Sequence, residues 1–289
     1  MKTIPSSIAS QFFSFLLLLL LPLLLLSVYT SMAVDNTSPG SASSAPLSSS
    51  INPLCLDRLL SLDSKMSPGK IDLDDCQERF AEYSFSQNTP WQATYEKNNQ
   101  VKTKNFEELP DYAQYEIIGQ MQNSQVLLSY SANYGGSGTF NHAYLVQGLS
   151  LDNNHDSELT QTLAIEGGDR CFGSIEKLDI IAPGTFEIRR RTTASALIGY
   201  GLSAEKAAKV TKGLSDCALC CIGNYTERAT LKGKRELTSV TLFPKQSRSS
   251  DSAKDRCLNQ LTMADSHTVL MTKENLKELQ EKFIRECAK

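Results

Sequence analysis

The stretch that decides the fold is QVLLSYSANYGGSGTFNHAYLVQ, residues Gln125–Gln147, near the middle of a 289-residue chain. Two runs rich in β-forming residues, Gln125–Tyr134 and Thr139–Gln147, flank the turn Gly135-Gly136-Ser137-Gly138. Glycine adopts positive φ at little steric cost, and alternating apolar residues on both sides of a glycine-rich turn are typical of a β-hairpin. The stretch therefore predicts two antiparallel strands joined by a glycine-rich tip.

Outside this hairpin, the residue pattern predicts further strands and few helices. Strands are expected at Trp91–Tyr95, Glu158–Ile165, Phe186–Thr192, Tyr225–Leu231 and Leu237–Phe243. The stretch from Pro110 to Met121 predicts a short helix, because proline suits a first helical turn and apolar residues follow it. Since strands and helices do not alternate as they do in parallel sheets, we expect an α+β domain built on an antiparallel sheet.

Helices are expected at both ends of the globular part. An apolar face that starts near Leu54, a Ser67-Pro68-Gly69 turn and a second amphipathic run at Leu73–Tyr83 together predict an N-terminal helical hairpin. Ser203 is a good N-cap for a helix that starts at Ala204. Thr272 caps a C-terminal helix, whose apolar stripe consists of Leu276, Leu279, Phe283, Ile284 and Cys287.

The first 33 residues have the pattern of a secretory signal peptide. Residues Phe12–Val28 are almost all apolar, and Ser31-Met32-Ala33 places small residues at a cleavage site. We expect the mature chain to begin at Val34; the alternative is an uncleaved membrane anchor, because the apolar run is just long enough to span a bilayer. Residues 34–53 are predicted to be a flexible Ser/Pro-rich tether, and residues 54–289 a single globular domain.

Charge and composition exclude several classes of function. The chain carries 29 Lys and Arg against 32 Asp and Glu, a formal net charge of −3, and so lacks the basic surplus of a nucleic-acid-binding protein. The sequence contains no cofactor-binding motif and no His-Glu-x-x-His metal motif. We therefore expect no nucleic-acid partner, no cofactor, and no membrane contact after signal cleavage. The predicted location is secreted or periplasmic.

Eight cysteines are expected to stabilise the exported domain, because oxidising compartments convert thiols to disulfides. A Cys55–Cys76 bond is plausible, since the two residues lie on the two arms of the predicted hairpin. Cys217, Cys220 and Cys221 also fit half of a zinc site or a redox dithiol. We favour structural disulfides, with the adjacent Cys220 and Cys221 each bonded to a distant cysteine. The remaining cysteines are Cys171, Cys257 and Cys287.

Few residues could support acid–base catalysis. The histidines are His142, His155 and His267, and a hydrolase could combine His142 with Ser137 and Asp169, or use His267 as its base. Nothing in the sequence brings these side chains together, and a catalytic role requires that geometry. We therefore expect no catalytic activity. The alternative is a secreted hydrolase that acts on envelope or extracellular polymers.

The glycine-rich tip is the predicted binding element, because exposed loop tips that carry aromatic residues can contact partners. Separately, Asp169 and Arg170 are expected to form a local ion pair at a strand exit beside a disulfide, where Gly167-Gly168 would allow a tight turn. The favoured function is an exported binding protein, inhibitor-like by analogy, with a protein or polysaccharide partner. A second alternative is a Cys-based redox or metal-handling protein. The residues of the tip are Tyr134, Gly135, Gly136, Ser137, Gly138 and Phe140.

Overall fold

The computed structural model describes residues 51–61, 69–89, 92–97, 109–151, 154–244, 252–262 and 268–288. The predicted signal peptide and the tether up to residue 50 lie outside the described residues, as does His267. Ile51 and Asn52, the next residues of the predicted tether, are buried. The Asn52 amide donates to the Phe80 carbonyl, so the packed domain includes the last residues of that segment. Among the described residues, no helix is long and apolar enough to cross a membrane.

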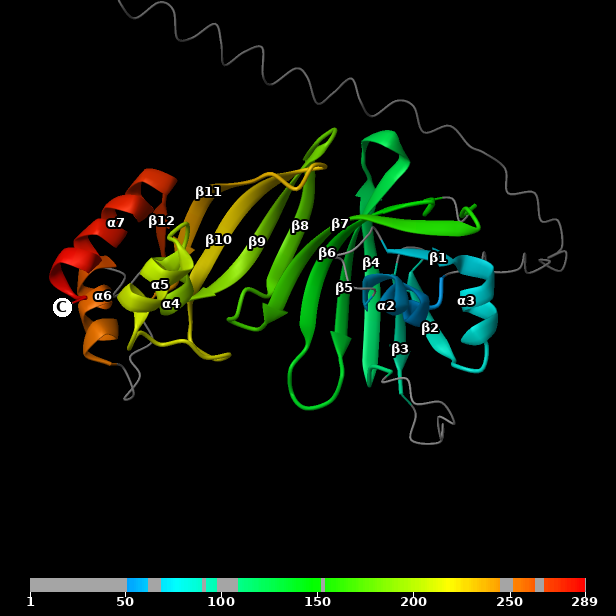
Figure 1. Ribbon diagram of the computed structural model, residues 1–289, viewed down its shortest axis with the longest axis horizontal. Coiled ribbons are helices and arrows are strands. Elements are labelled where there is room, and N and C mark those ends of the chain that lie inside the picture. The colour runs from blue at the N-terminus through cyan, green and yellow to red at the C-terminus, as the bar shows by residue number, and fades with distance from the viewer. Residues whose placement is uncertain are drawn as a thin grey trace, which may run out of the picture. The chain divides into compact units, whose positions relative to one another are not determined.

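The fold is α+β, and the strands of the described residues form two antiparallel sheets in place of the single sheet expected (Figure 1). The first sheet has the order β1-β7-β6-β5-β4-β3-β2 and the second the order β12-β11-β10-β9-β8. The strands of the first sheet are β1 Lys70–Asp72, β2 Phe85–Thr89, β3 Gln92–Glu96, β4 Tyr112–Gln120, β5 Gln125–Asn133, β6 Phe140–Gln147 and β7 Glu158–Asp169. Those of the second are β8 Ile175–Ala182, β9 Thr185–Thr193, β10 Cys221–Thr230, β11 Arg235–Leu242 and β12 Val269–Met271.

The predicted β-hairpin is confirmed as β5 and β6, which are paired in register from Gln125 opposite Gln147 to Ala132 opposite Phe140. Alternate residues of β5 face two different cores. Val126 and Leu128 pack under the N-terminal helix, whereas Leu127 packs against the second sheet. Because side chains alternate along a strand, burial on both faces produces the continuous apolar run in β5.

The predicted helix between Pro110 and Met121 is wrong, since these residues form β4. Ala113 and Tyr115 are buried two positions apart and lie opposite Ala132 and Tyr130 of β5. The apolar residues of this segment fit both a helical and an alternating pattern, and pairing with the central hairpin selects the strand.

Helices cover the outer face of each sheet. The helix α2 (Pro53–Ser61) packs over the first sheet, and α3 (Leu73–Arg79) follows β1. The turn predicted between them lies mostly outside the described residues, and β1 intervenes before α3. Four helices pack on the second sheet: α4 Ala194–Gly199, α5 Ala204–Thr211, α6 Ala253–Thr262 and α7 Lys273–Glu286. A short 3₁₀ helix, η1, covers Gln122–Ser124.

Both predicted N-caps are confirmed. The Ser203 hydroxyl accepts from the Lys206 amide at the start of α5, and the Thr272 hydroxyl accepts from the Asn275 amide at the start of α7. The Asn275 side chain accepts from the Thr272 amide in return, which completes a capping box. These caps fix the starts of two of the four helices that pack on the second sheet.

All eight cysteines are described and form four disulfides: Cys55–Cys76, Cys171–Cys221, Cys217–Cys220 and Cys257–Cys287. The expected disulfide stabilisation and the Cys55–Cys76 bond are therefore found. The expectation that Cys220 bonds a distant cysteine is wrong, because it pairs with Cys217 three residues before it. A turn between these two residues, in which the Cys220 amide donates to the Cys217 carbonyl, brings their side chains together.

Candidate functional site

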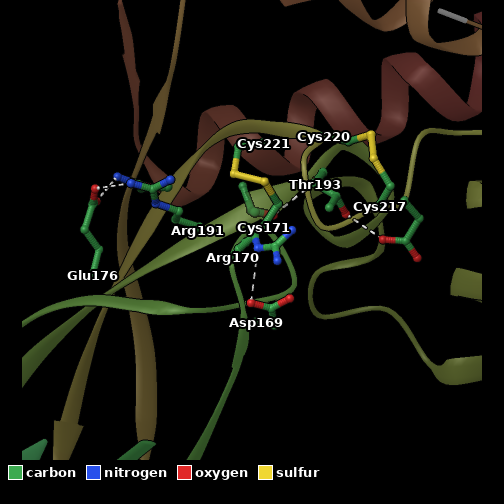
Figure 2. Close-up of a disulfide and its surroundings, with 12 residues drawn as sticks. Asp169, Arg170, Cys171, Glu176, Arg191, Thr193, Cys217, Cys220 and Cys221 are labelled. Carbon is green, nitrogen blue, oxygen red and sulfur yellow. Dashed lines mark hydrogen bonds and ion pairs between the residues drawn. A yellow bond between two sulfur atoms is a disulfide. The ribbon is translucent and has the colours of Figure 1, made fainter. Parts of the chain in front are cut away.

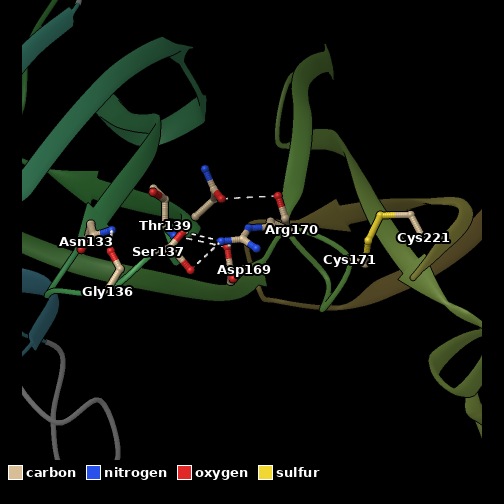
Figure 3. Close-up of polar contacts among 10 residues, drawn as sticks. Asn133, Gly136, Ser137, Thr139, Asp169, Arg170, Cys171 and Cys221 are labelled. Atoms are coloured by element: carbon tan, nitrogen blue, oxygen red, sulfur yellow. Dashed lines mark hydrogen bonds and ion pairs between the residues drawn. A yellow bond between two sulfur atoms is a disulfide. The ribbon is translucent and has the colours of Figure 1, made fainter. Parts of the chain in front are cut away.

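The glycine-rich tip, residues 134–140, is fixed by hydrogen bonds at its base. The Asn133 side chain accepts from the Gly135 amide at 2.7 Å and donates to the Gly136 carbonyl at 3.3 Å. Gly135 and Gly136 have φ of 109° and 76°, a region that glycine enters without a side-chain clash. These contacts define one conformation of the tip (Figure 3).

The corner after β7 holds the tip from the other side. The Arg170 guanidinium donates to the carbonyl and the hydroxyl of Ser137, and the Asp169 carboxylate accepts from the Thr139 amide at 3.2 Å (Figure 3). The predicted Asp169–Arg170 ion pair is present at 3.5 Å. Arg170 itself has a φ of 46°, which is uncommon for a residue other than glycine. Two loops 30 residues apart in sequence thus form one connected surface.

The role expected for Gly167 and Gly168 needs correction, because both lie within β7 and the turn starts after them. A Cβ on Gly167 would lie 1.8 Å from the Asn141 carbonyl oxygen, and one on Gly168 would lie 1.7 Å from that of Phe172. Glycine is therefore required for close backbone approach and not for a tight turn. The same approach places the Phe172 backbone against β7.

The Tyr134 side chain is anchored to the fold by its hydroxyl group. Its hydroxyl donates to the carboxylate of Asp57 in α2, which also accepts from the Tyr130 hydroxyl at 2.5 Å. Burial raises the pKa of Asp57, and the two tyrosine hydrogen bonds oppose that shift. Burial also raises the pKa of Tyr134, and the Asp57 hydrogen bond adds to this effect. The ring of Tyr134 remains exposed although its hydroxyl is held.

Three aromatic side chains of the two loops are exposed to solvent. Tyr134, Phe140 and Phe172 have between 45% and 53% of their surface accessible. Phe140 lies opposite Asp169 in the β6–β7 pairing, and Phe172 follows in the corner. Phe172 carries no sequence signal that distinguishes it from a buried residue, so the sequence did not identify it as a surface residue.

Two pockets lie beside the corner, and Arg170 and Arg191 line both. The larger, of about 400 Å³, also contains Leu219, Phe243 and Leu258. The smaller, of about 290 Å³, is lined by polar and charged residues: Ser137, Thr139, Asn141, Asp169, Arg170, Ser174, Glu176 and Arg191. The Arg191 guanidinium pairs with Glu176 at 3.2 Å (Figure 2). Arg170 and Arg191 therefore contribute to the same two pockets.

A buried charge lies behind this surface. The carboxylate of Glu227 pairs with Arg190 at 3.7 Å and with Arg235 at 3.6 Å, and it accepts from the Tyr200 hydroxyl at 2.9 Å. The Arg190 guanidinium also donates to the Gly173 carbonyl at 3.2 Å. These contacts tie the corner to β9 and β10, because movement of Arg190 would remove one of the two cations that pair with the buried Glu227.

The catalytic candidates are only partly brought together. His142 lies on β6 with its ring 5.8 Å from that of Tyr144, and burial lowers its pKa. Its Nδ1 atom has no hydrogen-bond partner among the described residues. The Ser137 hydroxyl contacts Arg170, and no hydrogen bond between described residues joins it to His142. Asp169 accepts from a backbone amide of the tip, so its observed contact is structural.

The sulfur atoms proposed as metal ligands are all paired. Cys217 and Cys220 bond each other, and Cys221 bonds Cys171 (Figure 2). Within the described part of the chain, no group of three or more His, Cys, Asp and Glu side chains is placed to hold a metal ion. Thiolate ligation by these cysteines would require the disulfides to be reduced first.

Comparisons with known proteins found no match to a protein-family model, a curated protein or a solved structure.

Proposed function

We propose that this chain is an exported binding protein whose recognition surface consists of the glycine-rich tip and the corner 169–174. The observation that carries the proposal is the direct link between two exposed loops through Arg170 and Ser137. Each loop presents exposed aromatic side chains. Aromatic residues and arginine are enriched in protein–protein interfaces, and they contribute most of the binding energy of those interfaces.

Rigidity supports the same proposal. A loop that is already ordered loses less conformational entropy when a partner binds. The tip is held at Asn133, Thr139 and Ser137, and the corner is held by the Cys171–Cys221 disulfide and by Arg190. A surface of this kind favours a protein partner, because it combines apolar anchors with a guanidinium.

The test uses the mature domain with a photocrosslinking benzoylphenylalanine in place of Phe140. The matched control carries the same group in place of Leu270, which is 72% exposed on β12. Extracellular material of the host is the source of partners. We expect one protein adduct from position 140 and not from position 270, and competition by the unlabelled native domain should remove it.

Competition with variants sharpens the result. The Phe140→Ala and Phe172→Ala domains should compete roughly tenfold or more weakly than the native domain, whereas Leu270→Ala should compete equally well. A partner that is competed equally by all three variants would overturn the proposed surface. Retention on an insoluble polysaccharide that depends on Phe140 and Phe172 would reject a protein partner and assign a carbohydrate one.

A further inference from the structure

The turn Cys217–Cys220 carries a disulfide unlike the other three. It closes a loop between residues three positions apart, whereas the others join residues 21 to 50 positions apart. A bond across so short a loop restrains little of the chain, because loop-closure entropy grows with loop length. This bond can therefore open while the long-range disulfides keep the fold closed.

The Cys217–Cys220 disulfide also differs from the other three in its solvent accessibility. Cys217 is exposed, whereas Cys55, Cys76 and Cys171 are buried and the other cysteines are only partly accessible. Exchange requires an incoming thiolate to approach a disulfide sulfur, so access to Cys217 decides which bond reacts first. Leu219, inside the turn, is 66% exposed and gives an apolar contact beside the bond.

The larger pocket lies on the Cys220 side of the bond and not on the Cys217 side. Its volume is about 400 Å³, and Cys220 lines it together with Cys171 and Cys221. Figure 2 shows the two disulfides to which these cysteines belong. The guanidiniums of Arg170 and Arg191 line the same pocket, and nearby cations favour a thiolate over a thiol. Both guanidiniums also pair with carboxylates, Asp169 and Glu176, which reduces that effect.

We propose that Cys217–Cys220 is a thiol–disulfide exchange site that oxidises a dithiol of a peptide or protein. One substrate thiolate attacks Sγ of Cys217, the Cys217–Cys220 bond breaks, and Cys220 leaves as a thiolate. The second substrate thiolate then attacks the substrate sulfur of the mixed disulfide and releases Cys217. Two electrons pass from the dithiol to the Cys217–Cys220 pair, and the two protons lost by the substrate balance those taken up by the two cysteines.

The first experiment treats the folded chain with a low concentration of dithiothreitol, quenches it with N-ethylmaleimide and maps the alkylated peptides by mass spectrometry. We expect Cys217 and Cys220 to be labelled at least tenfold faster than Cys257 and Cys287, with the circular dichroism spectrum unchanged. The Cys257–Cys287 bond is the internal control, because both of its residues are partly accessible. Equal labelling rates, or labelling only after addition of urea, would overturn the proposal.

The second experiment measures oxidation of a synthetic peptide that carries two cysteines. We expect about one equivalent of peptide disulfide per native chain, and a loss of at least tenfold in the C217S/C220S variant. The C257S/C287S variant should retain the native yield. Equal oxidation by native and C217S/C220S chains would reject the assignment. Because the labelling experiment uses only the native chain, misfolding of a variant does not remove the test.

Discussion

Removal of the Cys171–Cys221 disulfide should destabilise the fold far more than removal of Cys217–Cys220. The first bond joins residues 50 positions apart and the second joins residues three apart. In the chain-entropy account, a closed loop of 50 residues contributes about 4 kcal/mol at 25 °C, and one of three residues contributes about 2 kcal/mol. We therefore expect C171A/C221A to lose about 2 kcal/mol more than C217A/C220A.

The measurement is urea denaturation of both double variants beside the native chain, followed by circular dichroism. A loss of about 4 kcal/mol is a large part of a typical stability of about 5–15 kcal/mol, so the midpoint of C171A/C221A should shift clearly. The bond also anchors the corner beside Arg170, and its loss should open that corner locally. Equal destabilisation by the two variants, or a larger loss in C217A/C220A, would refute the loop-length argument.

Three further predictions concern separate parts of the molecule. Thr272→Ala removes the hydroxyl that caps α7 and should lower the free energy of unfolding by about 1 kcal/mol in urea titrations. Replacement of Gly135–Gly138 with a two-residue turn breaks the exposed contacts between Ser137 and Arg170, and thermal unfolding should show a loss of less than about 1 kcal/mol. Burial lowers the pKa of His142 below the ordinary histidine value of 6.5, so as the pH falls the unfolded chain takes up a proton before the folded chain does. The free energy of unfolding should therefore decrease as the pH falls below about 6.5, and His142→Gln should flatten that decrease.

Local signals in the sequence identified the elements that depend on neighbouring residues. The glycine-rich turn with alternating flanks predicted β5 and β6, and the hydroxyls of Ser203 and Thr272 predicted the starts of two helices. Each of these features depends on contacts between residues at most 22 positions apart in the chain. For that reason, the residue pattern alone is sufficient to predict these strands and helix starts.

Elements that depend on distant contacts could not be predicted in the same way. The residues of β4 fit either a helix or a strand until Tyr115 is placed opposite Tyr130. The division into two sheets depends on whether β7 and β8 pair with each other across the corner. In the structure β7 and β8 do not pair with each other: β7 pairs with β6, and β8 pairs with β9. No local pattern at residues 170–174 predicts that the two strands belong to different sheets.

In the candidate site, too, contacts between residues distant in the sequence could not be predicted. The sequence placed Tyr134 at an exposed tip, but its hydroxyl reaches Asp57, 77 residues earlier in the chain. This bond fixes the ring and uses the one proton of the hydroxyl, so the hydroxyl can no longer donate to a partner. Tyr134 can therefore contribute to binding chiefly through the exposed face of its ring, as a phenylalanine would. Affinity at the tip should then depend more on Phe140 and Phe172, whose side chains carry no competing polar contact, than on the tyrosine hydroxyl.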